Sequence, residues 1–158
     1  MFLLKTAAAI RKATSADINA IHEIISSYSE EGILLSRTLD DINAGLDNFF
    51  VAEIGKETVG VITFFDYGDH LKEVRSLAVH KGYLRRRIGS DLLHELIRHL
   101  TAANTPRIFV LTYTPAFFEK NGFIEISMDT LPEKIWKDCM YCKKQDNCTE
   151  TALEYTVR

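Results

Sequence analysis

The spacing of hydrophobic residues changes several times along the chain, and each change predicts a different element. Residues 10–13 are typical of a short strand, and residues 14–17 (Thr-Ser-Ala-Asp) have the pattern of a capping box before a helix. Four isoleucines then fall on one helical face: Ile18, Ile21, Ile24 and Ile25. A second helix is expected after Thr38, with Ile42 and Leu46 on its apolar side. The first part of the chain is therefore predicted to be strand, helix, helix.

The next part of the chain is rich in β-branched and aromatic residues. Two such runs, at 49–54 and 58–65, are joined by Gly55 and Lys56 and predict a β-hairpin. Residues 73–79 predict a third strand after a polar turn. We therefore expect three consecutive strands here.

Hydrophobic residues return to helical spacing after Gly89, which predicts a long amphipathic helix. Its apolar positions are Leu92, Leu93, Leu96, Ile97 and Leu100. A strand at 107–111 then completes a strand-helix-strand unit. Beyond it we expect a short helix at 115–120, a strand at 123–126 and a last strand at 152–157.

Length and composition predict a single domain, 1–158, with a core at about residues 10–126 and a tail at 127–158. Hydrophobic residues make up 46% of the chain, which suffices for one continuous core. The formal net charge of −3 argues against a nucleic-acid partner, because binding to the phosphate backbone needs a surplus of Lys and Arg. No apolar run is long enough for a membrane span or a secretory signal, so we expect a cytoplasmic protein without a membrane partner.

One segment combines the features of an anion-binding site. From Leu77 to Ser90, a buried strand leads through a basic loop into the start of the amphipathic helix. Free N–H groups and the positive end of the helix dipole point at whatever lies before a helix. Arg85, Arg86 and Arg87 add positive charge at the same place. The predicted ligand is a phosphate or pyrophosphate, and the alternative is a solvated surface run of arginines.

The order of the predicted elements resembles that of the GNAT acetyltransferase superfamily from about residue 10 to residue 126. The unit ends in Phe-Glu-Lys-Asn-Gly-Phe at 118–123, and the basic loop stands where the family has Gln/Arg-x-x-Gly-x-Gly/Ala. The matching positions here are Leu84, Arg87 and Gly89, so only the last glycine is kept. The resemblance implies an α+β, GNAT-like acyl-CoA N-acyltransferase fold, with a mixed central sheet flanked by helices, and acetyl-CoA as the co-substrate.

The same resemblance implies which residues bind the co-substrate. Main-chain groups of the strand would follow the pantetheine and the carbonyl, namely those of Leu77, Ala78 and Val79. The loop and the helix start would surround the phosphates, namely Arg85, Arg86, Arg87, Ile88, Gly89 and Ser90. Gly89 would let the ligand approach the backbone, and an arginine in place of the first loop glycine adds a cation for phosphate.

Several stretches of the chain resemble the short bacterial amino-acid N-acetyltransferases that make N-acetylglutamate for arginine biosynthesis. These stretches lie at 10–13, 32–37, 74–80 and 131–139. The resemblance implies L-glutamate as the acceptor amine. Arg37 would then bind a carboxylate of the acceptor, because the resembled enzymes place that loop over it; an exposed loop arginine is the alternative. Lys72 and Arg75 are further cations whose facing the sequence does not determine.

Acetyl transfer from a thioester requires a neutral amine, a stabilised oxyanion and departure of the thiolate, but no covalent nucleophile. Glu73 lies six residues before Val79, the offset at which many members of the resembled family have a glutamate that accepts the amine proton. It is the candidate base, and a solvent-facing carboxylate at a strand end is the alternative. Phe118 stands where the family often has a tyrosine acid, so Tyr113 is the candidate acid, with a packing residue as the alternative. Because CoA thiolate leaves readily, a dedicated acid is not required.

The three cysteines, Cys139, Cys142 and Cys148, all lie in the tail. They could hold zinc with a fourth ligand from elsewhere, but a structural site normally shows four ligands, so no metal is predicted. A redox-sensitive pair or packed thiols are the alternatives.

Two other functions of the protein also stay open: a non-catalytic acyl-CoA-binding regulatory module, and acetylation of protein or other small-molecule amines. The sequence also leaves open whether the protein forms a homodimer.

Overall fold

The computed structural model describes residues 7–68, 70–132, 135 and 150–156. Within these ranges the centre of the molecule is a seven-stranded sheet in the order β1-β2-β3-β4-β5-β7-β6. The strands are β1 (Ala9–Lys12), β2 (Phe50–Ile54), β3 (Glu57–Asp66), β4 (Leu71–Val79), β5 (Arg107–Thr112), β6 (Ile124–Glu125) and β7 (Thr151–Thr156). The α-helices are α1 (Ile18–Ser29), α2 (Leu39–Ala44), α3 (Ile88–Ala102) and α4 (Pro115–Lys120).

The sheet is mixed. β4 and β5 pair in parallel, whereas every other neighbouring pair of these strands is antiparallel. The predicted hairpin is β2 and β3, with Gly55 at a φ of 63° in its turn. β7 lies between β5 and β6 and pairs along all of β5. A mixed sheet flanked by helices confirms the predicted α+β fold.

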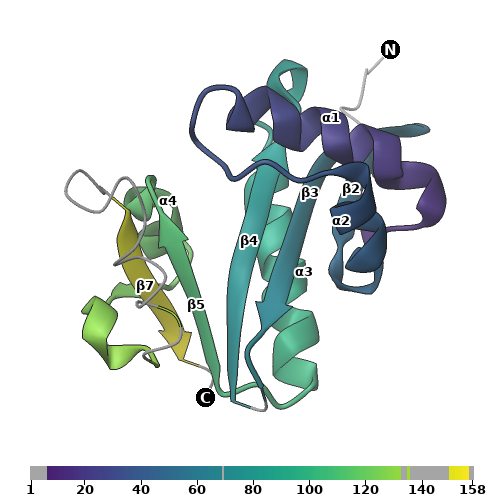
Figure 1. The fold of residues 1–158 in the computed structure, drawn as a ribbon. Helices are drawn as coiled ribbons and strands as arrows, with labels where there is room; N and C mark the ends of the chain where they lie inside the picture. The colour runs from purple at the N-terminus through teal and green to yellow at the C-terminus, as the bar shows by residue number, and fades with distance from the viewer. Residues whose placement is uncertain (1–6, 69, 133–134, 136–149, 157–158) are drawn as a thin grey trace.

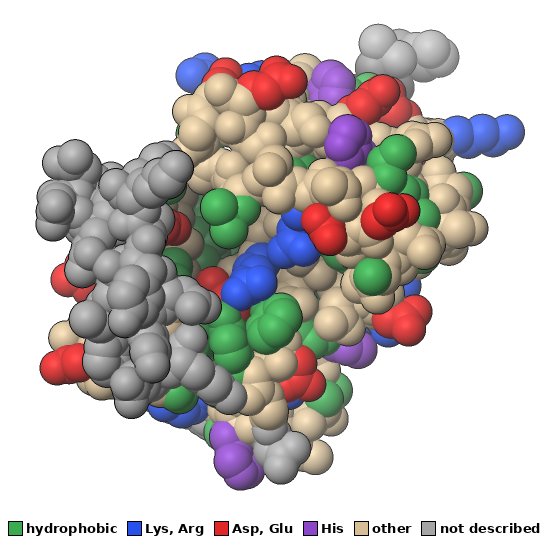
Figure 2. Space-filling model, viewed as in Figure 1, with side chains coloured by type: hydrophobic (Ala, Val, Ile, Leu, Met, Phe, Trp, Pro, Cys, Tyr) green, Lys and Arg blue, Asp and Glu red, His purple; other side chains and the backbone are tan. Residues whose placement is uncertain are grey.

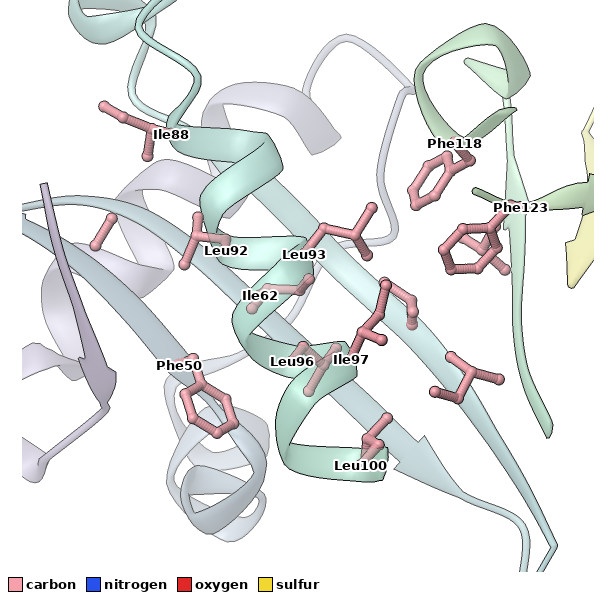
Figure 3. Close-up of a cluster of buried hydrophobic side chains, with 14 of the residues drawn as sticks. Phe50, Ile62, Ile88, Leu92, Leu93, Leu96, Ile97, Leu100, Phe118 and Phe123 are labelled. Carbon is pink, nitrogen blue, oxygen red and sulfur yellow. The ribbon is translucent and has the colours of Figure 1, made fainter. Parts of the chain in front are cut away.

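α3 packs its apolar stripe against one face of the sheet, as Figure 3 shows. The predicted stripe is buried at every position, namely Leu92, Leu93, Leu96, Ile97 and Leu100. Ile88 extends it into the first turn of the helix, and Phe118 and Phe123 lie beside it near α4. Gly60 of β3 lies under the helix, where an added Cβ would be only 2.9 Å from Cδ1 of Leu92. The missing side chain at Gly60 therefore lets α3 approach the sheet.

α1 and α2 cover the opposite face, over β3 and the end of β4 (Figure 1). The buried residues of this second core are Ile21, Ile24, Ile25, Ile42, Phe49, Val51, Val61 and Ala78. Thr38 caps α2 as predicted, since its Oγ1 accepts a hydrogen bond from the Asp41 N–H at 3.0 Å. This core fixes the connection between α1 and α2 above the sheet.

An ion-pair network fastens β1 to the start of α1. Arg11 donates two hydrogen bonds to Asp17, at 2.8 and 2.9 Å, and two to Glu53 of β2, at 3.1 and 2.7 Å. Asp17 also accepts from the Thr14 N–H at 2.8 Å and from the Thr58 hydroxyl at 2.9 Å. Burial raises the pKa of Asp17, but these hydrogen bonds outweigh it and lower the pKa to about 2.

The two parallel strands separate toward their C-terminal ends, as Figure 1 shows. β4 pairs with β5 only from Leu71 to Val74, although it continues to Val79. β5 pairs with β4 only from Arg107 to Val110. The last part of β4 therefore has an edge that β5 does not cover.

Two helix boundaries differ from the predicted ones. α3 begins at Ile88 rather than after Gly89, so Gly89 lies in its first turn. Leu46, predicted on the apolar side of the second helix, lies instead in a 3-10 turn, because α2 ends at Ala44 with Gly45 as its C-cap. Among the described residues, no helix is long and apolar enough to cross a bilayer.

Candidate active site

The uncovered edge of β4 presents main-chain donors. Backbone groups of successive residues point to opposite edges of a strand. The His80 N–H bonds to the Val59 carbonyl of β3 at 2.7 Å, so the N–H groups of Leu77 and Val79 point to the other edge. The Val79 carbonyl accepts a hydrogen bond from the Tyr28 hydroxyl of α1 at 2.7 Å. These two N–H groups therefore face the gap between the ends of β4 and β5, where β5 does not pair with them.

The loop before α3 has an unusual backbone. Arg85 and Arg87 have φ values of 66° and 63°, in the left-handed region that favours glycine. Arg86 lies over the ring of Tyr83, at 5.0 Å from its centroid. All three arginines are exposed, and in the described part of the chain none has a carboxylate within salt-bridge distance. Unneutralised charge before a helix N-terminus fits a phosphate group.

Ile88, Gly89 and Ser90 form the first turn of α3. The Ile88 side chain is buried in the core, so only its main chain can meet a ligand. A Cβ added at Gly89 would lie 3.6 Å from Cζ of Phe117, which is an ordinary van der Waals contact. Packing within the protein therefore accepts alanine at this position as well as glycine.

A bulge in β4 brings two neighbouring side chains to one face. The pairing of β4 with β3 shifts by one residue around Ser76, whose φ is 53°. Regular alternation would place Arg75 and Ser76 on opposite faces, but the bulge turns both toward the side covered by α1. There the Ser76 Oγ accepts a hydrogen bond from Nε of Arg37 at 2.7 Å, and the Arg75 guanidinium lies 4.4 Å from the centroid of the Phe65 ring.

Arg37, from the connection between α1 and α2, is half-buried rather than an exposed loop arginine. Its guanidinium lies 5.8 Å from the centroid of the Phe49 ring. Burial and then the charge of Arg75 lower the pKa of Arg37, yet a guanidinium stays charged at neutral pH. No carboxylate of the described residues lies within salt-bridge distance of it. Figure 2 shows Lys and Arg side chains in a hollow in the middle of this face.

Glu73 is buried, at 7% exposure, and does not face solvent as a strand-end carboxylate. Its Oε1 accepts hydrogen bonds from Nε of Arg75 at 2.7 Å and from the Tyr67 hydroxyl at 3.0 Å. Nη2 of Arg75 also donates to the Tyr67 oxygen at 2.7 Å. Burial and then the Glu73 charge raise the pKa of Tyr67 to about 12, so its hydroxyl stays a donor. The candidate base is thus held in a closed cluster with an arginine and a tyrosine.

Tyr113 directly follows β5 and is half-buried, at the end of the strand that borders the uncovered edge. Phe118 is buried and packs edge-to-face on Phe117 and Phe123, with centroid distances of 5.1 and 5.3 Å. The tyrosine that the family often has at this place is therefore replaced by a core residue.

Sequence reasoning did not identify Tyr28, Tyr67 or Ser76. Nothing in the sequence marks the bulge at Ser76, because it depends on how β3 and β4 pair. Tyr67 and Tyr28 have no motif that distinguishes them from packing residues. Lys72, by contrast, stays outside the cluster, since its Nζ binds Oδ1 of Asp66 at 3.2 Å.

Within the described ranges, no group of three His, Cys, Asp or Glu could hold a metal ion. Cys139, Cys142 and Cys148 lie outside these ranges. Zinc binding, a redox pair and packed thiols therefore stay alternatives from the sequence.

Comparison with known proteins identifies the family. A family model described as an acetyltransferase (GNAT) domain matches residues 45–125. An uncharacterised N-acetyltransferase of Chlorobaculum tepidum is 35% identical over 148 residues, which are 94% of this chain and 96% of that protein. The chain belongs to the GNAT acetyltransferase family. The predictions of a GNAT fold and of an acetyl-CoA-dependent N-acetyltransferase are confirmed.

Two other relatives of this GNAT acetyltransferase are larger proteins. The amino-acid acetyltransferase of Yersinia pseudotuberculosis is 28% identical over 132 residues, 82% of this chain. The N-acetylglutamate synthase of Neisseria gonorrhoeae, complexed with coenzyme A and N-acetyl-glutamate, matches 98% of this chain with a TM-score of 0.86 at 25% identity. The chain spans only 30% and 36% of these two proteins. A Mycobacterium tuberculosis protein in complex with CoA and NLQ shares the fold, with a TM-score of 0.82 at 23% identity over 95% of this chain and 99% of that one.

Proposed function

We propose that this GNAT acetyltransferase transfers the acetyl group of acetyl-CoA to the α-amine of a small amino acid, L-glutamate, by direct attack. The observation that carries the proposal is the half-buried Arg37, bound to Ser76 at the bulge of β4 and without a carboxylate partner among the described residues. An amino-acid acceptor brings such a carboxylate with it. The relatives named amino-acid acetyltransferase and N-acetylglutamate synthase support the same class of acceptor.

Acetyl-CoA would lie between the ends of β4 and β5. Its pantetheine amide and acetyl carbonyl oxygens would accept hydrogen bonds from the Leu77 and Val79 N–H groups, which β5 does not cover. Its pyrophosphate would lie before α3, on the N–H groups of the first turn, with Arg85, Arg86 and Arg87 supplying charge. Ala78 would contribute its main chain only, because its side chain is buried against α1.

Glu73 would accept the proton of the acceptor ammonium, through a water molecule. Its Oε1 is occupied by Arg75 and Tyr67, whereas no described residue donates to Oε2. The neutral amine then attacks the thioester carbon: the C–N bond forms, the C–S bond breaks, and the thiolate leaves with the electron pair, while the attacking nitrogen loses its remaining extra proton to water and becomes the neutral amide. Tyr113 directly follows β5 and is the candidate donor of a proton to that thiolate.

The metabolic pathway and the cellular location follow from the same proposal. N-acetylglutamate production would place the enzyme in arginine biosynthesis in the cytoplasm. A single domain and an assembly as a homodimer stay predictions from the sequence.

The test is an acceptor panel. Purified protein is incubated with acetyl-CoA and, separately, L-glutamate, L-glutamine, L-lysine, a peptide with a free N-terminus, or no amine, and released thiol is followed. We expect thiol release above the no-amine rate with L-glutamate, and mass spectrometry should identify N-acetylglutamate. Turnover of the peptide or of L-lysine, without turnover of L-glutamate or L-glutamine, would refute the proposal.

A further inference from the structure

We infer that Arg75 determines the acceptor specificity of this site by binding the side-chain carboxylate of a dicarboxylic amino acid, while Arg37 binds the α-carboxylate. The inference rests on the proposed function and adds to it the residue that distinguishes a dicarboxylic from a monocarboxylic acceptor. It comes from the bulge at Ser76, which places two guanidinium groups on one face of β4.

The positions of the two arginines fit two carboxylates on one small molecule. Arg37 is fastened to Ser76 at 2.7 Å, and Arg75 is the neighbouring residue of the strand. The two guanidinium groups are close enough for the charge of Arg75 to act on Arg37. Without the bulge Arg75 and Ser76 would lie on opposite faces, so no regular strand would produce this pair.

The Arg75 guanidinium is held in a defined orientation. Nε donates to Glu73 at 2.7 Å, Nη2 donates to the Tyr67 oxygen at 2.7 Å, and Cζ lies 4.4 Å from the centroid of the Phe65 ring. The side chain is 32% exposed, and Nη1 has no acceptor among the described residues. Arg75 therefore offers a preorganised edge to a ligand, and Tyr67 is a positioning residue that acts through it.

Lys72 provides a natural comparison on the same strand. It lies three residues before Arg75, but its ammonium group is engaged by Asp66 at 3.2 Å and by the Gly68 carbonyl at 3.5 Å. Because Lys72 and Arg75 are both cations of β4, charge alone does not select Arg75. What distinguishes Arg75 is the bulge beside it and its hydrogen bonds to Glu73 and Tyr67.

The experiment compares L-glutamate with L-glutamine, which differ in one charged oxygen. A hydrogen-bonded charge pair contributes about 1.5–3 kcal/mol, which is a ratio of roughly 10 to 100 in kcat/KM. Wild-type protein should prefer glutamate by that ratio, and the preference should fall as salt is raised. Arg75→Gln should abolish the preference, because kcat/KM should fall by about that ratio more for glutamate than for glutamine.

Three further variants separate recognition from structure. Tyr67→Phe should raise KM for glutamate several-fold and leave KM for glutamine unchanged, a split that loss of stability would not produce. Lys72→Gln should leave the glutamate to glutamine ratio at its wild-type value. Arg75→Lys retains the charge but not the fork to Glu73 and Tyr67, so it should restore only part of the preference. Any loss of Glu73 orientation lowers kcat for both acceptors alike and does not alter the ratio.

Each outcome is decisive. A wild-type ratio near one, or an Arg75→Gln ratio equal to that of wild type, would overturn the inference while glutamate turnover still supported the proposed function. Absence of turnover with both amino acids, together with turnover of another amine, would overturn the proposed function and this inference with it.

Discussion

A methyl group added at Gly60 tests how closely α3 depends on the sheet beneath it. The new Cβ would lie 2.9 Å from Cδ1 of Leu92, 3.1 Å from Cγ2 of Ile88 and 3.4 Å from Cβ of Ala52. Carbon atoms pack at about 3.5–4.0 Å, and Leu92 is fully buried, so the Leu92 side chain or the helix that carries it must shift. Overpacking of this kind costs about 1–3 kcal/mol, and replacing glycine returns about 0.5–1 kcal/mol of backbone entropy. Gly60→Ala should therefore destabilise the protein by about 1–2 kcal/mol.

The same displacement should reach the co-substrate. Ile88 and Leu92 belong to the first turns of α3, the end at which we propose that the pyrophosphate binds. We expect Gly60→Ala to weaken CoA binding about threefold to tenfold, because N–H donors act only over short distances. The matched control for stability is Gly89→Ala, where the new Cβ meets no protein atom closer than 3.6 Å. Its stability should equal that of wild type or exceed it by about 0.5 kcal/mol.

Urea unfolding followed by circular dichroism measures the first effect, and titration calorimetry with CoA measures the second. If Gly60→Ala unfolds at the wild-type midpoint and binds CoA with wild-type affinity, then neither stability nor CoA affinity depends on the close contact between α3 and β3. If Gly89→Ala lowers the unfolding midpoint more than Gly60→Ala does, the packing argument for Gly60 is wrong.

Three further predictions address the other parts of the site and the fold. Glu73→Gln should lower kcat about 100-fold or more and flatten its rise with pH, with the exposed Glu125→Gln as the control in the same pH–rate assay; an unchanged profile would remove Glu73 as base. Arg37→Ala should raise KM for the amino acid roughly 10- to 100-fold and leave KM for acetyl-CoA unchanged, and equal changes in both would contradict its place at the acceptor. The lowered pKa of Asp17, from 3.8 to about 2, stabilises the fold by about 2 kcal/mol above the unfolded pKa, and this is lost as pH falls from about 5 toward 2. Asp17→Asn should therefore be less stable at pH 7 by about that amount, with the difference vanishing near pH 2 in urea titrations.

The sequence predicted the regular elements well because each has a strong local signal. The hairpin of β2 and β3, the amphipathic α3 and the helix α4 at Pro115–Lys120 all follow from periodicity and turn residues. The position of β7 between β5 and β6 could not be predicted in this way, since it depends on pairing between segments that are more than 25 residues apart in sequence. The start of α3 at Ile88 was not predicted either, because the helical spacing of apolar residues is evident only after Gly89.

The candidate site was predictable where charge is clustered along the chain and not where the strands position it. Arg85, Arg86 and Arg87 are adjacent in sequence, and a run of three cations needs no structure to be noticed. Arg75 was recognised only as a cation of unknown facing, because its facing is set by a bulge at the next residue. Pairing between β3 and β4, rather than any motif, therefore decides which cations of β4 lie at the proposed acceptor site.

The loop before α3 shows how a chain can lack the first glycine of the family motif and retain the conformation that this glycine serves. Arg87 takes a φ of 63°, which costs an L-residue about 1 kcal/mol relative to glycine. The same residue places a guanidinium at the N-terminus of α3, and a charge-assisted hydrogen bond to phosphate contributes about 1.5–3 kcal/mol. The strain is present in the free protein, whereas the compensation arises only when phosphate binds. Stability and co-substrate affinity therefore favour different residues at this position: Arg87→Gly should stabilise the loop conformation and weaken CoA binding.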